Sequence, residues 1–376
     1  MSRYRYDIDG IVQVHSSVRL PELKFFSTKE DRRPDLVVRM GTVGAKPRLN
    51  TTIKNGGMTL RYEEHLGWFS ANFKVHMGDP VEVTVNPILA LSPHVVYTNI
   101  IEVLLRFLMV KHGRMLLHSA CINLRGRGIL LSAETDTGKT STVLRLLRDE
   151  EGWFFSDDMT IMDADGLASR YPKPMTISAH TLKALDLNRL NARQRAALMV
   201  QSRVHSREGR TFAKRLAELN LPIMTINSVM QTAVPPPKYM VDTLVDCEIG
   251  ERTAVDALYF IERGTPTAQR RLNLAEVVER LQLNTEDAYG FPPYSQLAPH
   301  LVIGGHSLVD MLESERRILE SAMKGVHATL IRVNDFGWSK IILDDLSSSA
   351  TELVGRPSLS RQLADEKELA AAAAAS

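Results

Sequence analysis

The chain has 376 residues, of which 44% are hydrophobic and 24% charged, as expected for a folded protein with one large or two ordinary domains. Its 46 Lys and Arg residues nearly balance 44 Asp and Glu residues, and a formal charge of +2 argues against a nucleic acid as partner. Two cysteines cannot build a disulfide framework, and no apolar run reaches roughly 18 residues, so a cytoplasmic protein without a membrane span is expected.

Residues 1–97 show the pattern of a small β-rich module. Short runs that alternate apolar with polar residues, or that are rich in β-branched and aromatic residues, are separated by turns. Glycine and proline mark two of these turns, at residues 78–80 and at Asn86-Pro87. The sequence therefore predicts an N-terminal module built of strands.

An α/β domain is predicted over residues 98–345. It opens with a helix at 98–113, where apolar residues recur at helical spacing and Gly113 stands at the position of a C-cap. Beyond Arg114, strand-like and helix-like segments alternate, which is typical of an α/β fold. The run at 128–133 is almost continuously apolar, as in a strand that is covered on both faces of its sheet.

The second half of the chain continues this alternation. Residues 188–232 have a helical pattern that ends at three consecutive prolines, and they form a predicted basic helical insertion at about 186–235. Later elements are expected to be a strand at 257–263, helices at 273–283 and 307–323, and a pair of strands at 328–335 and 338–343 that turns at Phe336-Gly337. Residues 346–376 are predicted to be a disordered tail.

The most informative segment lies where a strand-like run passes into a helix. Residues 133–140 fit the Walker A pattern except at the first position, where Ala133 replaces glycine. In such a loop, backbone N–H groups and a helix N-terminus face phosphate oxygens, Lys139 reaches the outer phosphates, and the Thr140 hydroxyl binds Mg²⁺. Asp136 also replaces a usual glycine and brings a negative charge near the phosphates. The predicted nucleotide-binding residues are Ala133, Glu134, Thr135, Asp136, Thr137, Gly138, Lys139, Thr140 and Ser141.

An acidic pair, Asp157 and Asp158, follows an apolar strand 18 positions beyond Lys139. One carboxylate at such a place can bind Mg²⁺, and a second can accept the proton of an incoming hydroxyl group. The predicted metal ligands are Thr140, Asp157 and Asp158. Both aspartates and Lys139 are the predicted catalytic residues, and the sequence leaves open which aspartate is the base.

The run from residue 116 to residue 163, with its phosphate loop, hairpin and acidic pair, resembles the HPr kinase/phosphorylase and phosphoenolpyruvate carboxykinase superfamily. The resemblance covers about 114–175 and is closest to HPr kinase-like proteins of unassigned substrate. It implies a P-loop core of that fold, a Lys-and-Mg²⁺ phosphate site, one aspartate as base, and a catalytic role for His118. Thr135-Asp136 replaces the Ser-Gly of true HPr kinases, and residues 171–180 replace their acidic-Arg-Gly segment, so HPr is not the expected acceptor.

Further cations are candidates for contact with the substrate or the transferred phosphoryl group. Arg170 and Lys173 flank a Tyr-Pro pair, and Arg271 lies in a loose counterpart of the family's late arginine loop. Ordinary surface positions are the alternative for Arg170 and Lys173.

Residues 189–215 are strongly basic, with eight Lys and Arg residues and one acid, Glu208. The segment fits a solvated helical face, a docking patch for an anionic substrate that includes Arg207 and Arg210, or a helix in peripheral contact with a membrane.

Together these patterns predict a cytoplasmic kinase that uses ATP and Mg²⁺. It would transfer the γ-phosphoryl group to a hydroxyl of a small molecule, a peptide or protein serine, or a lipid alcohol. The alternative is a nucleotide-binding regulatory protein that engages a partner through its basic helical segment. The sequence is compatible with a homo-oligomer and does not identify the acceptor.

Overall fold

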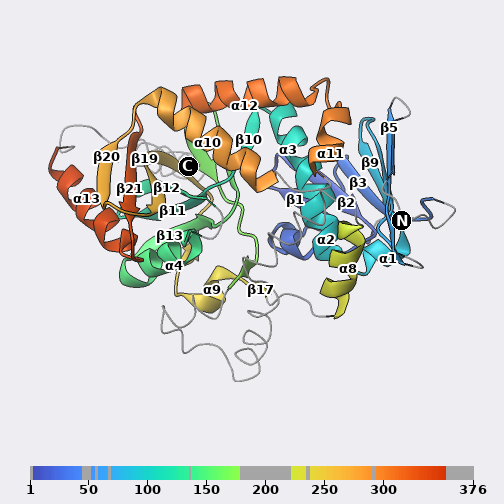
Figure 1. Cartoon of the computed structure of the whole chain (residues 1–376), viewed down its shortest axis with the longest axis horizontal. Coiled ribbons are helices and arrows are strands. Elements are labelled where there is room, and N and C mark those ends of the chain that lie inside the picture. The colour runs from blue at the N-terminus through green and yellow to red at the C-terminus, as the bar shows by residue number, and fades with distance from the viewer. Residues whose placement is uncertain are drawn as a thin grey trace, which may run out of the picture.

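The computed structural model describes residues 3–44, 52–55, 58–66, 69–134, 137–177, 222–233, 238–289 and 294–352. Its two large β-sheets lie toward opposite ends of the molecule, and helices pack beside both (Figure 1). The fold is therefore α/β, as the alternation of strand and helix patterns predicted.

The strands predicted near the N-terminus form a seven-stranded sheet in the order β1-β2-β3-β9-β8-β5-β4. In β9, Val81, Val83 and Val85 are buried while the residues between them are partly exposed, which is the period-two pattern of a strand with one covered face. The sheet consists of β1 (Tyr4–Ile8), β2 (Val12–Ser16), β3 (Leu36–Met40), β4 (Thr52–Asn55), β5 (Thr59–Glu63), β8 (Phe73–His76) and β9 (Val81–Val85). Two smaller elements accompany it, the 3₁₀-helix η1 (Pro21–Phe26) and the hairpin of β6 (His65–Leu66) and β7 (Phe69–Ser70).

A helical segment connects the two sheets. It consists of α1 (Pro87–Ala90), α2 (Pro93–Val96), the π-helical turn η2 (Tyr97–Ile101) and α3 (Glu102–Lys111). The side chain of Asn86 caps α1 by accepting a hydrogen bond from the Leu89 N–H at 3.0 Å. Gly113 follows the helix with a φ of +67°, which confirms the predicted helix end.

The helix Pro93–Lys111 is long and apolar enough to cross a membrane. However, 83% of its most apolar stretch is buried against other parts of the chain, as in the core helix of a globular protein. Length and composition here give only weak evidence for a membrane span. The boundary predicted between residues 97 and 98 falls inside this helical segment.

The second sheet runs in the order β10-β14-β15-β19-β12-β11-β13-β18, with β21 beside β19 and β20 at the outer edge. The three central strands β12, β19 and β21 are parallel. The strands are β10 (Arg114–Leu117), β11 (Ala120–Leu124), β12 (Arg127–Ser132), β13 (Gly152–Ser156), β14 (Thr160–Asp163), β15 (Leu167–Ser169), β18 (Glu248–Ile249), β19 (Arg252–Arg263), β20 (Ala268–Arg271) and β21 (His327–Val333). Gly128 is required where β12 meets β19, because an added Cβ would lie 1.9 Å from the Ala254 carbonyl oxygen.

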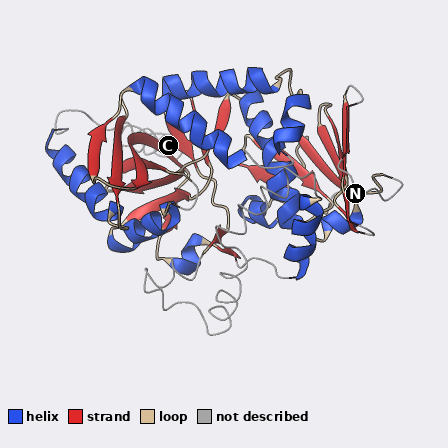
Figure 2. Ribbon diagram, in the orientation of Figure 1, coloured by secondary structure: helices blue, strands red, loops and turns tan. Residues whose placement is uncertain are grey.

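Helices cover both faces of this sheet, which gives three layers (Figure 2). Side chains of β12 alternate between the two cores: Ile129 and Leu131 share one with α4 and α13, and Leu130 shares the other with α10 and α12. The helices are α4 (Lys139–Asp149), α10 (Leu274–Tyr289), α12 (Leu308–Ala322) and α13 (Trp338–Glu352). Shorter elements are α8 (Ile223–Ala233), α9 (Val241–Leu244), α11 (Tyr294–Leu297), η3 (Ala298–His300), and the pair β16 (Met175–Thr176) and β17 (Lys238–Tyr239).

One predicted element is wrong. Residues 338–343 were expected to pair as a strand with 328–335, but they open the helix α13, and β21 pairs with β19 and β20 instead. The buried residues Trp338, Ile342 and Leu346 have helical spacing, which a window of six residues was too short to reveal. The tail predicted from residue 346 therefore begins within a helix.

The predicted basic helical insertion lies mostly outside the described residues. Only α8 and β17 are described within or directly after it.

Candidate functional site

The predicted phosphate loop joins β12 to α4 at the carboxyl edge of the parallel strands. Thr135 and Asp136 lie outside the described residues. Gly138 stands just before α4 with a φ of +128°, and an added Cβ would lie 3.1 Å from Trp338 and 3.2 Å from Phe336. Glycine is therefore required both by the backbone conformation and by the two aromatic rings packed against it. Thr142 holds the first turn of the helix, because its N–H and its hydroxyl each donate to the Gly138 carbonyl at 3.0 Å.

Lys139 is the first residue of α4, and its ammonium group is buried. The Nζ atom makes no hydrogen bond with any residue that the structure describes. Burial lowers the pKa of Lys139, and the nearby carboxylates of Asp158 and Asp157 oppose this shift. A buried ammonium without a hydrogen-bond acceptor is costly, so its position favours a site completed by an anionic ligand.

Asp157 follows β13 and faces the start of α4. Its Oδ2 atom accepts a hydrogen bond from the Thr140 hydroxyl at 2.8 Å, while Oδ1 is buried without a partner among the described residues. Burial raises the pKa of Asp157 to about 6, against the opposing effects of Lys139 and Thr140. One carboxylate oxygen is thus held in place, and the other makes no hydrogen bond within the part of the chain that the structure describes.

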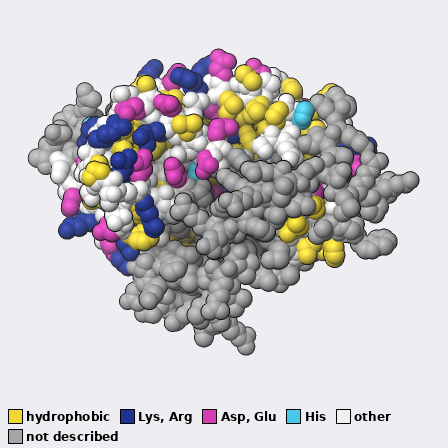
Figure 3. Space-filling model, in the orientation of Figure 1, with side chains coloured by type: hydrophobic (Ala, Val, Ile, Leu, Met, Phe, Trp, Pro, Cys, Tyr) yellow, Lys and Arg dark blue, Asp and Glu magenta, His cyan; other side chains and the backbone are white. Residues whose placement is uncertain are grey.

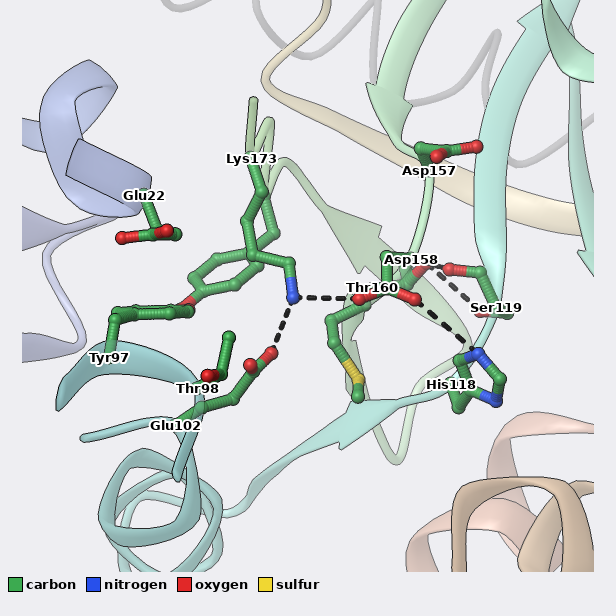
Figure 4. Close-up of polar contacts among 12 residues, drawn as sticks. Glu22, Tyr97, Thr98, Glu102, His118, Ser119, Asp157, Asp158, Thr160 and Lys173 are labelled. Carbon is green, nitrogen blue, oxygen red and sulfur yellow. Dashed lines mark hydrogen bonds and ion pairs between the residues drawn. The ribbon is translucent and has the colours of Figure 1, made fainter. Parts of the chain in front are cut away.

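Asp158 points away from Asp157 toward two cationic or potentially cationic side chains (Figure 4). Its Oδ2 atom accepts from Lys173 Nζ at 2.8 Å, and Oδ1 lies 3.4 Å from His118 Nε2. Burial favours a raised pKa, but Lys173, His118 and Lys139 together hold the pKa of Asp158 well below its usual value. Half of the side chain is nevertheless exposed (50%), so this ionised carboxylate can be reached by a ligand.

His118 lies between β10 and β11, with its ring fixed by α10. Its Nδ1 atom lies 3.0 Å from the Asn284 carbonyl oxygen, which can only accept, so Nδ1 carries a hydrogen. The Nε2 atom is therefore the one directed at Asp158. The Asn284 side chain also donates to Ser132 Oγ at 2.9 Å, which fixes this part of α10 to the last residue of β12.

Lys173 also contacts this site, and a role toward the transferred group stays a prediction. Its ammonium lies between Asp158 and Glu102, and it donates to Glu102 Oε1 at 2.5 Å (Figure 4). Burial alone would lower the pKa of Lys173, but the two carboxylates raise it, so the side chain stays charged. Unlike Lys139, this lysine is fully paired.

Two other predicted substrate residues, Arg170 and Arg271, contact side chains that do not belong to this site. Arg170 lies 3.4 Å from Asp9 and over the ring of Phe25, so residues of the N-terminal segment hold it away from the loop. Arg271 lies 3.9 Å from Asp345 and opposite Thr329 in β21, four residues before the strand end that faces the loop. The described contacts of Arg170 and Arg271 are therefore with these residues, and a role toward the substrate stays a prediction for both. Arg207 and Arg210 lie outside the described residues.

Basic side chains do gather over β20 and α10 on the face shown in Figure 3, but acidic side chains are interspersed with them. Arg270 pairs with Glu276 at 2.9 Å, and Arg280 pairs with Glu262 at 2.8 Å. Local pairing therefore neutralises much of this surface.

Sequence reasoning missed Glu102 and a second buried cluster near it. Glu22 of η1 is 2% exposed, and its Oε1 atom lies 2.6 Å from His94 Nδ1 and 2.7 Å from Lys238 Nζ. Burial would raise the pKa of Glu22, but His94 and Lys238 lower it to about 2. The available signal was Glu102, the single acid within the predicted helix at 98–113.

The residues at the loop fit a metal bound together with a phosphate ligand better than a metal held by protein alone. Among the described ranges, no group of three or more His, Cys, Asp and Glu side chains could hold a metal ion. The loop offers instead one hydroxyl, on Thr140, and the Asp157 carboxylate with an oxygen that has no partner. Mg²⁺ usually takes few protein ligands and completes its shell with water and phosphate oxygens, so this donor set suits it.

The chain is similar to the structure of the Hpr(Ser) kinase/phosphatase from Coxiella burnetii, with 7% identity and a TM-score of 0.26 over 64% of this chain and 99% of that one. No protein-family model matches the chain, and no curated protein matches it. A likeness at this score carries no argument about function, which must come from the site itself.

Proposed function

We propose that this chain is a Mg²⁺-dependent phosphotransferase that moves the γ-phosphoryl group of ATP to a hydroxyl acceptor. The observation that carries the proposal is the pair of orphaned atoms at the start of α4. Lys139 Nζ and Asp157 Oδ1 are both buried, and neither has a hydrogen-bond partner among the described residues. A triphosphate with its metal ion would supply an anion for the first atom and a cation for the second.

The loop and helix support the phosphate part of this proposal. The strand–loop–helix arrangement places the positive end of α4 and the Lys139 ammonium at one edge of the sheet. In a buried site, a cation fixed before the ligand arrives stabilises developing charge without reorganisation during the reaction. The sequence resemblance of residues 114–175 to HPr kinase-like proteins supports the same assignment.

Thr140 and Asp157 are the residues that would hold Mg²⁺, since a hydroxyl from the loop and an aspartate from the neighbouring strand is the usual pair in phosphate-loop proteins. Bound there, the ion would neutralise charge on the β- and γ-phosphates. The 2.8 Å hydrogen bond between Thr140 and Asp157 shows that the two side chains already converge on one place.

Asp158 is the proposed proton acceptor. It is ionised and half-exposed, and Lys173 and His118 hold its two oxygens in a fixed direction. As the acceptor oxygen forms its bond to the γ-phosphorus and the bond to the β-phosphate oxygen breaks, the hydroxyl proton passes to Asp158. The products are a phosphate ester and ADP. The candidate acceptors are small molecules, peptide or protein serines, and lipid alcohols.

Titration calorimetry with Mg·ATP on the wild type, Lys139→Ala and Asp158→Asn tests the proposal. We expect micromolar-range binding by the wild type, loss of binding in Lys139→Ala, and retained binding in Asp158→Asn without phosphoryl transfer in an acceptor screen. Lys324→Ala, which removes an exposed lysine far from the loop in sequence, is the matched control and should bind like the wild type.

Two outcomes contradict the proposal in different ways. Unchanged ATP binding in Lys139→Ala would show that the loop does not hold the phosphates. Full transfer activity in Asp158→Asn would remove the proposed base. Binding without transfer in the wild type against every acceptor class would favour the regulatory nucleotide-binding protein instead.

A further inference from the structure

The strands β19 and β21 extend beyond the end of β12, and we call their last residues, 261–263 and 331–333, the wall beside the phosphate loop. The last residue of β12, Ser132, is level with Phe260 of β19, and Phe260 is level with Leu330 of β21. Both neighbours continue for three more residues, from 260 to 263 and from 330 to 333, or roughly 10 Å at the usual rise of a strand. The ends of β19 and β21 therefore lie on one side of the loop that follows β12.

An exposed aromatic residue, Phe336, follows the end of β21 in this wall. This residue is 44% exposed, and a Cβ added at Gly138 of the loop would lie 3.2 Å from its ring. Trp338 packs edge-on against it at 5.7 Å between ring centroids and is completely buried. The Phe336 backbone carbonyl accepts from Arg145 of α4 at 3.0 Å, which ties the backbone of this residue to the helix that follows the phosphate loop.

A guanidinium group stacks on this ring. Arg263, the last residue of β19, has its Cζ atom 4.0 Å from the Phe336 ring centroid. The side chain is exposed, and no carboxylate of the described residues forms an ion pair with it. Its neighbour Glu262 is instead paired with Arg280 and Arg332. The cation is therefore positioned by an aromatic contact and keeps an open planar face.

This pair lies on the opposite side of the loop from the reacting groups. In the sheet, β12 has β19 and β21 on one side, and β11 and then β13 on the other. Asp157 and Asp158 follow β13, whereas Arg263 and Phe336 follow β19 and β21. A ligand whose phosphates occupy the loop would thus have its transferred end on the β13 side and its other end at the wall.

We propose that Arg263 and Phe336 form a stacking shelf for the base of a nucleotide, so that the phosphoryl donor is a nucleoside triphosphate and not an inorganic polyphosphate. The inference rests on the proposed function, because it takes the phosphates to lie on residues 133–141. Flat bases stack on aromatic rings and on guanidinium planes, and such stacking accepts any base because every base has a π-face.

The test separates the base from the phosphates. Binding of Mg·ATP and of Mg·tripolyphosphate, which has the same phosphate chain and no base, is measured by calorimetry on the wild type, Phe336→Leu and Arg263→Ala. We expect the wild type to prefer ATP, and each variant to lose on the order of tenfold in ATP affinity while tripolyphosphate binding stays the same. Leucine keeps apolar packing on Gly138 and Trp338, and Arg316→Ala, an exposed arginine on α12, is the control.

The outcomes distinguish this inference from the proposed function. Equal wild-type affinity for the two ligands, or equal losses for both ligands in the variants, would overturn the shelf while leaving the phosphate site in place. No binding of either ligand by the wild type would overturn the proposed function, and the shelf with it. Only one outcome supports the shelf: the wild type prefers ATP over tripolyphosphate, and both variants lose this preference.

Discussion

Two buried cations in this protein have opposite surroundings. Arg106 of α3 is 1% exposed and has every part of its guanidinium engaged: Glu315 accepts at 2.7 and 2.6 Å, Glu286 at 2.5 Å, and the Tyr294 hydroxyl at 2.8 Å. The ammonium group of Lys139 is also buried, yet it makes no hydrogen bond with a described residue. The first cation has its acceptors within the chain, whereas the second is the one for which we propose an anionic ligand.

The two residues show how a buried charge that stabilises the fold can be distinguished from one that is placed to bind a ligand. Arg106 joins α3 to α10, α11 and α12, and its planar fork suits several fixed acceptors at once. Lys139 has a compact charge at the end of a flexible chain and stands at a helix N-terminus. Removal of each cation should therefore have opposite consequences for stability and activity.

The largest effect is expected for Lys139→Ala. Phosphoryl transfer should fall on the order of a thousandfold, because a cation fixed at the developing charge is lost. The free energy of unfolding without ligand should stay the same or rise, since an uncompensated buried charge is removed. Steady-state kinetics and urea denaturation measure the two quantities. A large loss of stability would mean that Lys139 has an architectural role like that of Arg106.

The next effect is on stability. Arg106→Ala leaves the buried Glu315 carboxylate unpaired, so the free energy of unfolding should fall by roughly 3–5 kcal/mol. Urea denaturation followed by circular dichroism measures it. The double variant Arg106→Met, Glu315→Leu removes both charges and should recover much of the loss. A double variant no more stable than Arg106→Ala would contradict the account based on an unpaired charge.

A smaller, graded effect is expected from pH. Because the pKa of Asp157 is raised to about 6 and Mg²⁺ binds the ionised form, Mg·ATP affinity should fall roughly tenfold per pH unit below that value. In the protein without ligand, the raised pKa means that folding favours the protonated form of Asp157. The contribution of this group to the free energy of unfolding is therefore full below about pH 4, and it is lost as pH rises through about 6. Calorimetry across pH measures the affinity, and Asp157→Asn should flatten its dependence. A profile with the same slope in the variant would assign the titration to another group.

The smallest effect belongs to an exposed cation. Arg317 pairs with Glu313 one helical turn away on α12, and both side chains are mostly exposed. Arg317→Ala should therefore leave the urea midpoint unchanged within error, because solvent screens such a pair. A shift comparable to that of Arg106→Ala would mean that the surface of α12 contributes far more to stability than its exposure indicates.

The sequence alone predicted the parts of the site that depend on local order. The loop, the helix beginning at Lys139 and the acids after β13 follow from strand, glycine and hydrophobic patterns within about forty residues. The structure brings Lys139, Thr140, Asp157, Asp158, His118 and Lys173 together, and their chemical roles stay predictions.

What the sequence could not provide depends on contacts between distant segments. Arg170 and Lys173 are three residues apart and equally plausible as cations, but Asp9 holds the first and Glu102 holds the second. Glu102 comes from a helix whose apolar pattern indicated only a core element. Residues 338–343 were assigned to a strand because their helical spacing becomes clear only when residues as far as Leu346 are included.

The helix Pro93–Lys111 has a consequence for anyone who divides this protein into fragments. Glu102 reaches Lys173 beside the acidic pair, and Arg106, one turn further, anchors α10, α11 and α12. The same helix is buried in the core that contains the strands of the first sheet. A fragment starting at Thr98 would lose the first turns of this helix and expose its apolar side, so the phosphate-loop region should not fold as a separately expressed piece.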